Sequence, residues 1–448
     1  MNYDLAIIGA GPAGYTGAEQ AAKAGLSVIL FEKEQIGGVC LNWGCIPTKT
    51  LLYSAKTYDH IRSAEKYGVS VSGFAYDLPK IISRKNKIIR KLTAGIRARL
   101  KAQEVTIVAG KAEVNGSKGG VFEIACAEET YQAKRLLLAT GSETFVPPIP
   151  GIGEVPYWTS TEALDSKEVP ESLLIVGGGV IGMEFASFFN SMGSKVTVVE
   201  MLDEILGGID HEISALLREE YRKKGVEFFL SAKVTAFEGN KARFLHEGEE
   251  KEVTFDKVLM AAGRRPVLDS AVIANLNPAF DGRFIRVNEQ MQTSVPNVYA
   301  CGDITGRSML AHTAEREANV AVHTMIGIDD AMSYRAIPGV VYTSPEVSSV
   351  GASEEELKQK GIPYVVKKLP MSYSGRFVVE NEAGNGLCKL LIGDDEAILG
   401  AHVIGSPSSE FIVAAGMAIQ NALSAEEWAR TVFPHPTVSE IFKECLHA

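Results

Sequence analysis

Two glycine-rich fingerprints constrain the fold of this chain more than any other feature. Each lies between an apolar run and a helical stretch, and each is followed by a second apolar run that ends in a glutamate. The two sets are Gly9, Gly11 and Gly14 with Glu32, and Gly177, Gly179 and Gly182 with Glu200. In such a βαβ unit the turn and the helix N-terminus bind a pyrophosphate, and the acid accepts hydrogen bonds from ribose hydroxyls. The sequence therefore predicts two dinucleotide sites. They imply either two nucleotide ligands or one domain that has been duplicated.

Short apolar runs define the expected strands of both units. Those beside the fingerprints are Leu5–Ile8, Ser27–Phe31, Ser172–Val176 and Lys195–Val199. Two more are expected to close the sheets, Arg135–Leu138 before Thr140-Gly141 and Lys257–Met260 before Gly263.

Two acids bear on which cofactors bind. Asp303, in Cys301-Gly-Asp303 after an apolar strand, either binds a cofactor hydroxyl or is simply a turn acid. Glu200 would accept a hydrogen bond from a free ribose 2′-OH and repel a 2′-phosphate, so it favours NAD(H) over NADP(H).

The stretch Gly37–Lys49, GGVCLNWGCIPTK, carries two closely spaced thiols, Cys40 and Cys45. Such a pair can form a reversible redox disulfide. An expected helix from Leu51 would place Cys45 near a helix N-terminus, whose positive dipole end favours a thiolate. Two structural cysteines or half of a zinc site are the alternatives. The other four cysteines (126, 301, 388 and 445) are each single in the sequence, so no second ligand pair for zinc is evident and no metal site is predicted.

The segment Phe433–Glu440, FPHPTVSE, contains a candidate base. An imidazole is well suited to accept a thiol proton near neutral pH, and a nearby carboxylate would raise its basicity. His435 is therefore a candidate general base and Glu440 its partner. An ordinary loop histidine is the alternative for His435. For Glu440 the alternative is a helix capping box with Thr437.

Length and composition limit the remaining possibilities. A chain of 448 residues is too long for one core, and a net charge of −10 argues against general binding to nucleic acid or an anionic membrane. No apolar run approaches the roughly 20 residues of a membrane helix. The absence of a leader-like segment and the few cysteines favour a soluble, cytoplasmic protein, where catalytic disulfides are the usual kind.

Together these motifs resemble the FAD-dependent pyridine nucleotide–disulfide oxidoreductases, over nearly the whole chain. Additional matching segments are Ala139-Thr-Gly141, GGGVIGMEF from Gly177, and Ala262-Gly-Arg-Arg-Pro266. The most similar members oxidise protein-bound dihydrolipoamide with NAD⁺. One departure is Val39, where the family often has Thr. The resemblance implies an α/β fold: two Rossmann-like domains, for FAD and NAD, and a C-terminal α+β dimerisation domain.

The resemblance also implies boundaries and roles. The expected domains are 1–145 (FAD, first part), 146–265 (NAD), 266–335 (FAD, second part) and 336–448 (dimerisation). Cys40 would meet the dithiol and Cys45 the flavin, while His435, held by Glu440, would serve the disulfide of the partner subunit in a homodimer. The expected cofactor-binding residues are Gly9, Gly11, Gly14, Glu32, Lys49, Thr140, Gly141, Gly177, Gly179, Gly182, Glu184, Glu200, Gly263, Asp303 and Ala311.

Several alternatives accompany these roles. Lys49 and Glu184 would pair beside the flavin ring, although each could be a helix-surface charge. The expected partner is a lipoyl-bearing protein, either an acyltransferase component or a glycine cleavage carrier, and the sequence does not distinguish them. A reductase of another disulfide is disfavoured by the acids at Glu200, Asp203 and Glu204, since such enzymes generally use NADPH. A reductase of a metal ion such as mercury would need an adjacent C-terminal cysteine pair. A flavoprotein without chemistry would not need Cys40, Cys45 and His435.

Overall fold

The computed structural model describes residues 2–382 and 384–448 and divides into two compact units, each assembled from three segments. Unit 1 comprises Met1–Thr50, Pro79–Phe145 and Arg264–Ser333. Unit 2 comprises Leu51–Leu78, Val146–Gly263 and Tyr334–Ala448. The finer four-part division expected from the sequence stays a prediction.

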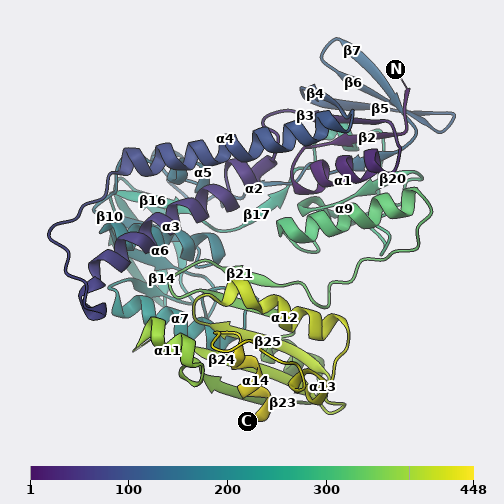
Figure 1. The fold of residues 1–448 in the computed structure, drawn as a ribbon. Coiled ribbons are helices and arrows are strands. Elements are labelled where there is room, and N and C mark those ends of the chain that lie inside the picture. Colours follow the sequence, from purple (N-terminus) through teal and green to yellow (C-terminus); the bar gives the residue numbers. More distant parts are fainter. Residues whose placement is uncertain (1, 383) are drawn as a thin grey trace. The chain divides into compact units, whose positions relative to one another are not determined.

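A five-stranded parallel sheet forms the centre of unit 1. Its order is β20 (Val298–Ala300), β8 (Leu136–Leu138), β2 (Leu5–Ile8), β3 (Val28–Glu32) and β4 (Thr106–Ala109). The strands are apolar and mostly buried, as expected of a parallel sheet covered on both faces. Helices α1 (Pro12–Lys23) and α9 (Ala311–Met325) pack side by side (Figure 1). The return of β20 to this sheet makes unit 1 discontinuous in sequence.

The rest of unit 1 contains helices and a second sheet. This sheet has the order β1 (Asn2–Tyr3), β7 (Glu129–Ala133), β6 (Val121–Cys126) and β5 (Ala112–Lys118). In it β1 pairs in parallel, and the other strands are antiparallel. Strand β9 (Ser142–Thr144) pairs antiparallel with β17 (Arg264–Pro266). Other elements are α2 (Gly38–Asn42), α8 (Ser270–Ile273), β18 (Phe280–Asp281), β19 (Phe284–Ile285) and most of α4 (Leu78–Ala102).

Unit 2 contains the second nucleotide-binding fold. Its parallel sheet has the order β12 (Glu227–Phe229), β11 (Lys195–Val199), β10 (Ser172–Val176) and β16 (Lys257–Met260). The strands predicted at β10, β11 and β16 are confirmed. The accompanying helices are α5 (Ser160–Leu164), α6 (Val180–Met192) and α7 (His211–Lys223), and an antiparallel sheet comprises β13 (Lys233–Glu238), β14 (Lys241–His246) and β15 (Glu249–Thr254).

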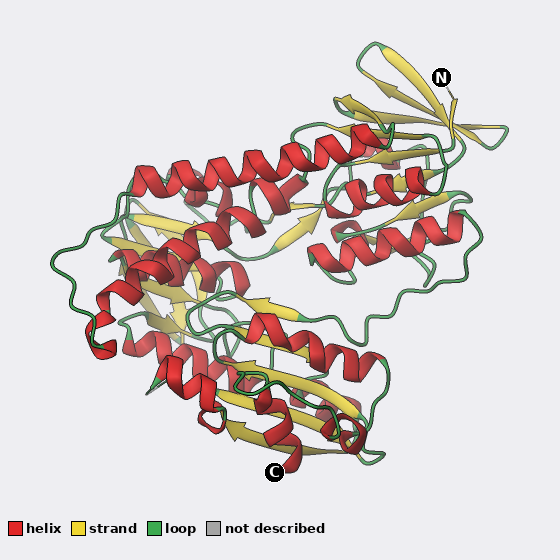
Figure 2. Cartoon of the chain, viewed as in Figure 1, coloured by secondary structure: helices red, strands yellow, loops and turns green. Residues whose placement is uncertain are grey.

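The C-terminal part of unit 2 is a five-stranded antiparallel sheet with helices (Figure 2). Its order is β21 (Gly339–Val341), β22 (Val347–Gly351), β25 (Ile398–Ile404), β24 (Leu387–Gly393) and β23 (Tyr364–Pro370). The helices are α10 (Glu354–Lys360), α11 (Gly375–Asn381), α12 (Ser408–Gln420), α13 (Ala425–Ala429) and α14 (Glu440–His447). Rings of Phe411 and Trp428 lie 5.3 and 5.1 Å from the ring of Phe442 in the core. This is the predicted α+β architecture.

A buried ion cluster joins the two halves of unit 2. Lys389 of β24 is 1% exposed, and its Nζ lies 2.9 Å from Asp210 at the start of α7 and 3.1 Å from Glu212. It also contacts Glu354 of α10. Because Asp210 is fully buried, the ammonium offsets the cost of burying its carboxylate. Burial raises the pKa of Glu354, but hydrogen bonds led by that from Lys389 lower it to about 2 overall.

Among the described residues, no helix has both the length and the apolar character needed to cross a membrane.

Candidate functional site

The two cysteines of the redox stretch lie on consecutive helices, and both belong to the unit 1 segment that ends at Thr50. Cys40 is in α2, and Cys45 is the first residue of α3 (Cys45–Arg62). Both are partly exposed free thiols. The predicted place of Cys45 at a helix N-terminus is confirmed. The helix starts six residues before the expected Leu51, because Pro47 is tolerated in the first turn, where N–H groups have no intrahelical partner.

The environment makes the two thiols unequal. A hydrogen bond with Cys45 and burial raise the pKa of Cys40, and the Lys49 ammonium opposes them only in part. A reduced pair carrying one negative charge therefore holds it on Cys45, at the positive end of α3, while Cys40 keeps its proton.

The first fingerprint is shaped by contacts that only glycine allows. Gly9 has φ +102°, and a Cβ there would lie 2.3 Å from the Ala139 carbonyl oxygen. Glu32 at the end of β3 accepts hydrogen bonds from the Ala10 N–H (2.8 Å, Oε2) and the Glu34 N–H (2.7 Å, Oε1). The carboxylate thus holds the turn in place and keeps lone pairs for a ribose.

The second fingerprint repeats this geometry in unit 2. Gly177 has φ +108°, and a Cβ there would lie 2.4 Å from the Ala261 carbonyl oxygen. Glu200 accepts hydrogen bonds from the Gly178 N–H (2.6 Å, Oε2) and the Leu202 N–H (2.8 Å, Oε1). The duplicated geometry follows from the duplicated sequence.

The turns leave room for a ligand at the middle glycine of each fingerprint. A Cβ at Gly179 would meet nothing within 4 Å, and one at Gly11 would meet only the Gly38 Cα, at 3.9 Å. The third glycines differ, because a Cβ at Gly14 or Gly182 would lie 1.8 or 2.0 Å from the carbonyl oxygen of the first glycine. Open backbone at the start of α1 and α6 fits the pyrophosphates of FAD and NAD.

Asp303 belongs to a network that the motifs did not reveal. Its carboxylate accepts a hydrogen bond from the Ser142 hydroxyl, which in turn accepts one from Arg264 Nε at 2.7 Å. Burial lowers the pKa of Arg264, and nearby charges on Asp303 and Cys45 oppose this. Ser142 directly follows Gly141, so its place beside a predicted site residue was the available signal.

The other expected cofactor residues of the two units lie in turns or at a helix start. Thr140 donates its hydroxyl hydrogen to the Val267 carbonyl oxygen at 2.8 Å. This hydrogen bond joins the second and third segments of unit 1. Gly141 and Gly263 have φ +71° and +108°, and Ala311 is the first residue of α9.

A second contact missed by the sequence reasoning joins α1 to α9. The Tyr15 hydroxyl donates to Glu315 Oε1 at 2.8 Å, and the Glu315 charge acts, as a minor contribution, to raise the pKa of Cys40. Also in α9, the buried Glu317 accepts the N–H of Gly302 at 2.6 Å. No motif marks these acids, because their partners are distant in sequence.

Lys49 and Glu184 fall in different units, so their ion pair stays a prediction. Lys49 is partly exposed on α3. Glu184 is only 3% exposed and accepts the Tyr342 N–H at 3.0 Å, so it is not a helix-surface charge.

His435 and Glu440 form a pair in the C-terminal domain. His435 Nδ1 lies 3.0 Å from Glu440 Oε1, and the histidine side chain is 79% exposed. The Thr437 N–H, at 2.8 Å from Oε2, and then the His435 contact lower the pKa of Glu440, against burial. The exposed ring, held by a carboxylate, can accept a proton from a molecule that approaches it.

The capping box given as the alternative for Glu440 is present only in half, because Glu440 accepts the Thr437 N–H but the Thr437 hydroxyl does not cap the helix. Helix α14 begins at Glu440 with Ser439 as its N-cap, and no side chain caps it. The Thr437 hydroxyl donates instead to the Pro434 carbonyl at 2.8 Å. Glu440 is therefore left to hold the Thr437 N–H and His435.

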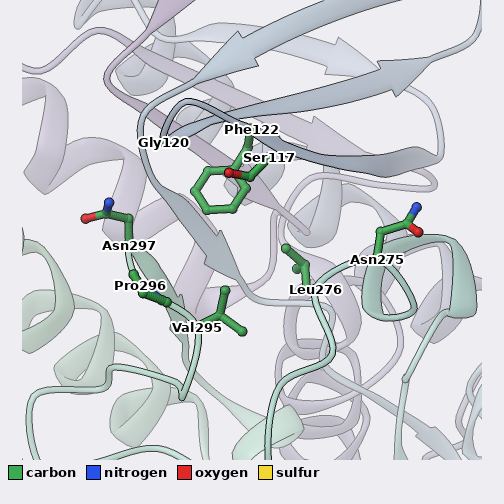
Figure 3. A pocket seen from close by; sticks show the side chains of 8 residues that line it. All are labelled: Ser117, Gly120, Phe122, Asn275, Leu276, Val295, Pro296 and Asn297. Carbon is green, nitrogen blue, oxygen red and sulfur yellow. The ribbon is translucent and has the colours of Figure 1, made fainter.

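No group of three or more His, Cys, Asp or Glu side chains in the described parts of the chain is arranged to hold a metal ion. A small pocket of unit 1 lies between the β5–β6 turn and two loops, 275–276 and 295–297 (Figure 3). It contains no charged side chain and none of the expected site residues.

Comparisons with known proteins agree with these features. Residues 3–318 match the family model described as pyridine nucleotide-disulphide oxidoreductase, and residues 337–446 match its dimerisation domain. The chain is 37% identical to dihydrolipoyl dehydrogenase of Mycoplasma pneumoniae over 452 residues, which covers 99% of this chain and 98% of the relative.

Two solved structures share the fold. LpdA from Mycobacterium tuberculosis has a TM-score of 0.90 at 25% identity, with 99% of both chains covered. The HOCl-induced flavoprotein disulfide reductase RclA from Escherichia coli has a TM-score of 0.86 at 29% identity, also with 99% of both chains covered. The predicted resemblance is confirmed: this chain belongs to the pyridine nucleotide-disulphide oxidoreductase family, as an FAD- and NAD-dependent enzyme with a dimerisation domain that supports a homodimer.

Proposed function

We propose that this chain is a dihydrolipoyl dehydrogenase, which oxidises a dihydrolipoyl group carried by another protein and reduces NAD⁺ to NADH. The observation that carries the proposal is the contact between Cys40 and Cys45, two unequal thiols on consecutive helices beside a flavin-type fingerprint. The full-length similarity to dihydrolipoyl dehydrogenases supports the choice of substrate. The six cysteines are all free thiols, which fits a cytoplasmic enzyme.

The roles of the sulfurs follow from their environments. Starting from the Cys40–Cys45 disulfide, a substrate thiolate attacks Cys40 Sγ, and Cys45 leaves as the thiolate. The second substrate sulfur then displaces Cys40, which releases lipoamide and leaves both cysteines reduced. The order fits the structure, because Cys45 at the start of α3 is the better leaving group.

His435 would accept the proton of the attacking substrate thiol, with Glu440 fixing its ring through Nδ1. Its Nε2 then faces outward, and we infer that it serves the disulfide of the partner subunit. Glu32, Asp303 and the Gly9–Gly14 turn would hold FAD, and Glu200 with the Gly177–Gly182 turn would hold NAD. Bound FAD would supply electron transfer between the dithiol and the nicotinamide.

Anaerobic titration of the yellow holoenzyme tests the proposal. Dihydrolipoamide should bleach the flavin, and added NAD⁺ should restore the colour with formation of NADH. Glutathione and NADPH serve as competing reductants in parallel titrations. Reduction by NADPH or glutathione, but not by dihydrolipoamide or NADH, would identify a reductase of another disulfide and refute the proposal.

A cysteine variant tests the assignment of the two sulfurs. Cys45→Ser should retain FAD but lose the long-wavelength charge-transfer band on two-electron reduction. Cys126→Ser, at a buried cysteine of the same unit, should keep the band. A band that persists in Cys45→Ser would assign the flavin-side role to another group.

A further inference from the structure

The C-terminal domain contains a second pair of neighbouring cysteines, far from each other in sequence. Cys388 lies in β24 and Cys445 in α14, which packs against β23 and β24. Both side chains are fully buried in the same core. Cys445 Sγ lies 3.8 Å from the Cys388 carbonyl oxygen and 3.2 Å from that of Lys367. The two cysteines are single in the sequence, and the fold brings them together.

The two thiols lie close enough for each to influence the ionisation of the other through a side-chain contact. Burial and this contact raise the pKa of Cys388, whereas the Cys388 thiol, despite burial, lowers the pKa of Cys445. Cys445 is thus the sulfur that ionises first. The Lys367 ammonium, whose Nζ is 2.6 Å from the Leu446 carbonyl oxygen, also favours the thiolate.

Packing alone does not require two cysteines to meet. A buried cysteine commonly acts as a small apolar side chain, and Cys126 and Cys301 are buried in unit 1 in this way. Cys445 differs in that its sulfur contacts the backbone of another cysteine, at 3.8 Å from the Cys388 carbonyl oxygen, where α14 packs on β24.

We propose that Cys388 and Cys445 are a second dithiol, which hydrogen peroxide oxidises to a disulfide that joins α14 to β24. The Cys445 thiolate attacks peroxide, the O–O bond breaks, and a sulfenic acid forms as hydroxide leaves. Cys388 then attacks the Cys445 sulfur, the S–O bond breaks, and the S–S bond forms. Two thiols lose two electrons and two protons, and one peroxide becomes two waters.

Local opening of α14 would admit the oxidant. The helix has eight residues, and elements this short open more readily than the whole domain unfolds. The bond would then suppress that opening. Since α14 begins with Glu440, the disulfide would also secure the carboxylate that holds His435.

Peptide mapping of the holoenzyme tests the pairing. The fully reduced enzyme is treated with hydrogen peroxide, free thiols are alkylated, and digests are analysed by mass spectrometry. We expect the amount of a disulfide-linked peptide that contains Cys388 and Cys445 to increase with peroxide concentration. Cys126 and Cys301 should be recovered in the alkylated form at every peroxide concentration. Free Cys388 and Cys445 after full oxidation of Cys40 and Cys45, or oxidation to sulfinic acid without a link, would overturn the proposal.

Hydrogen exchange tests the effect on α14 in the same wild-type samples. Because the disulfide would constrain two residues 57 apart, oxidation should slow amide exchange in α14 by at least about tenfold. Cys445→Ser should show no such slowing, and Cys126→Ser should behave as wild type. Equal exchange in reduced and linked wild-type enzyme would refute the stabilising role, even if the variant did not fold.

Discussion

Glu200→Gln tests whether one carboxylate sets the choice between NAD and NADP. In the structure both oxygens of Glu200 accept backbone N–H groups, from Gly178 at 2.6 Å and Leu202 at 2.8 Å. Glutamine keeps the shape and one acceptor, but its amide nitrogen must face the other N–H. The substitution therefore removes the charge and loosens the turn that receives the pyrophosphate.

The size of the effect follows from these contacts. A hydrogen bond to a charged group contributes about 1.5–3 kcal/mol, and losing one is equivalent to roughly 10- to 150-fold in binding. For NAD⁺ nothing offsets the loss of this hydrogen bond, so kcat/KM for NAD⁺ should fall by about 10- to 100-fold. For NADP⁺ the same loss is offset, because removing the carboxylate charge also removes its repulsion of the 2′-phosphate. The NAD⁺ to NADP⁺ ratio of kcat/KM should consequently fall at least about tenfold.

Steady-state kinetics with both nucleotides, at constant flavin content, measure this ratio. Glu249→Gln is the control, because Glu249 is an exposed acid of β15 in the same unit, and its substitution removes one negative charge outside the turn. Its ratio should stay within about twofold of wild type. An unchanged ratio in Glu200→Gln, or an equal change in both variants, would refute the contact-based reasoning.

Three further predictions concern the C-terminal domain. His435→Gln should lower turnover by roughly 10²–10⁴ while the exposed His447→Gln leaves it unchanged, and a loss below about threefold would exclude a general base. Lys389→Met should lower the free energy of unfolding in urea by about 3–5 kcal/mol, because it leaves Asp210 buried without a cation. The control Lys358→Met, which removes an exposed ion pair to Glu354, should lower it by about 0.5 kcal/mol or less. Similar losses in the two variants would contradict the role of the buried cluster. The pKa of Glu354 is lower in the folded state, about 2, than its usual 4.5, so its contribution to stability is present above pH 4.5 and lost as the pH falls towards 2. Acid unfolding followed by circular dichroism should show this loss, and Glu354→Gln should reduce it.

Sequence reasoning succeeded where local pattern determines structure. The strands Leu5–Ile8 and Ser172–Val176 are apolar runs directly before fingerprints, and both were predicted with their observed bounds. Their positions follow from two local features. Both faces of each strand are buried, and the glycine turn that follows each strand fixes the direction of the backbone. The place of Cys45 at a helix start was predicted for the same local reason.

It failed where distant residues determine structure. Strand β15, Glu249–Thr254, is so charged that only its pairing with β14 makes it a strand. Ser142 and Arg264 meet because the chain re-enters unit 1, and Cys388 meets Cys445 across the C-terminal core. The capping box is incomplete because α14 begins at Glu440 with Ser439 as its N-cap, so Thr437 does not occupy the N-cap position.

The late return of β20 to the first sheet has a consequence for biosynthesis. Until β20 emerges from the ribosome, β8 is an open edge, and Asp303, 161 residues after Ser142, has not been made. At about 5–20 residues per second the nascent chain waits roughly 8–30 s in this unfinished state. Flavin loading can be completed only after the inserted second nucleotide fold has been synthesised, so the two cofactor sites mature in the reverse of their order along the chain.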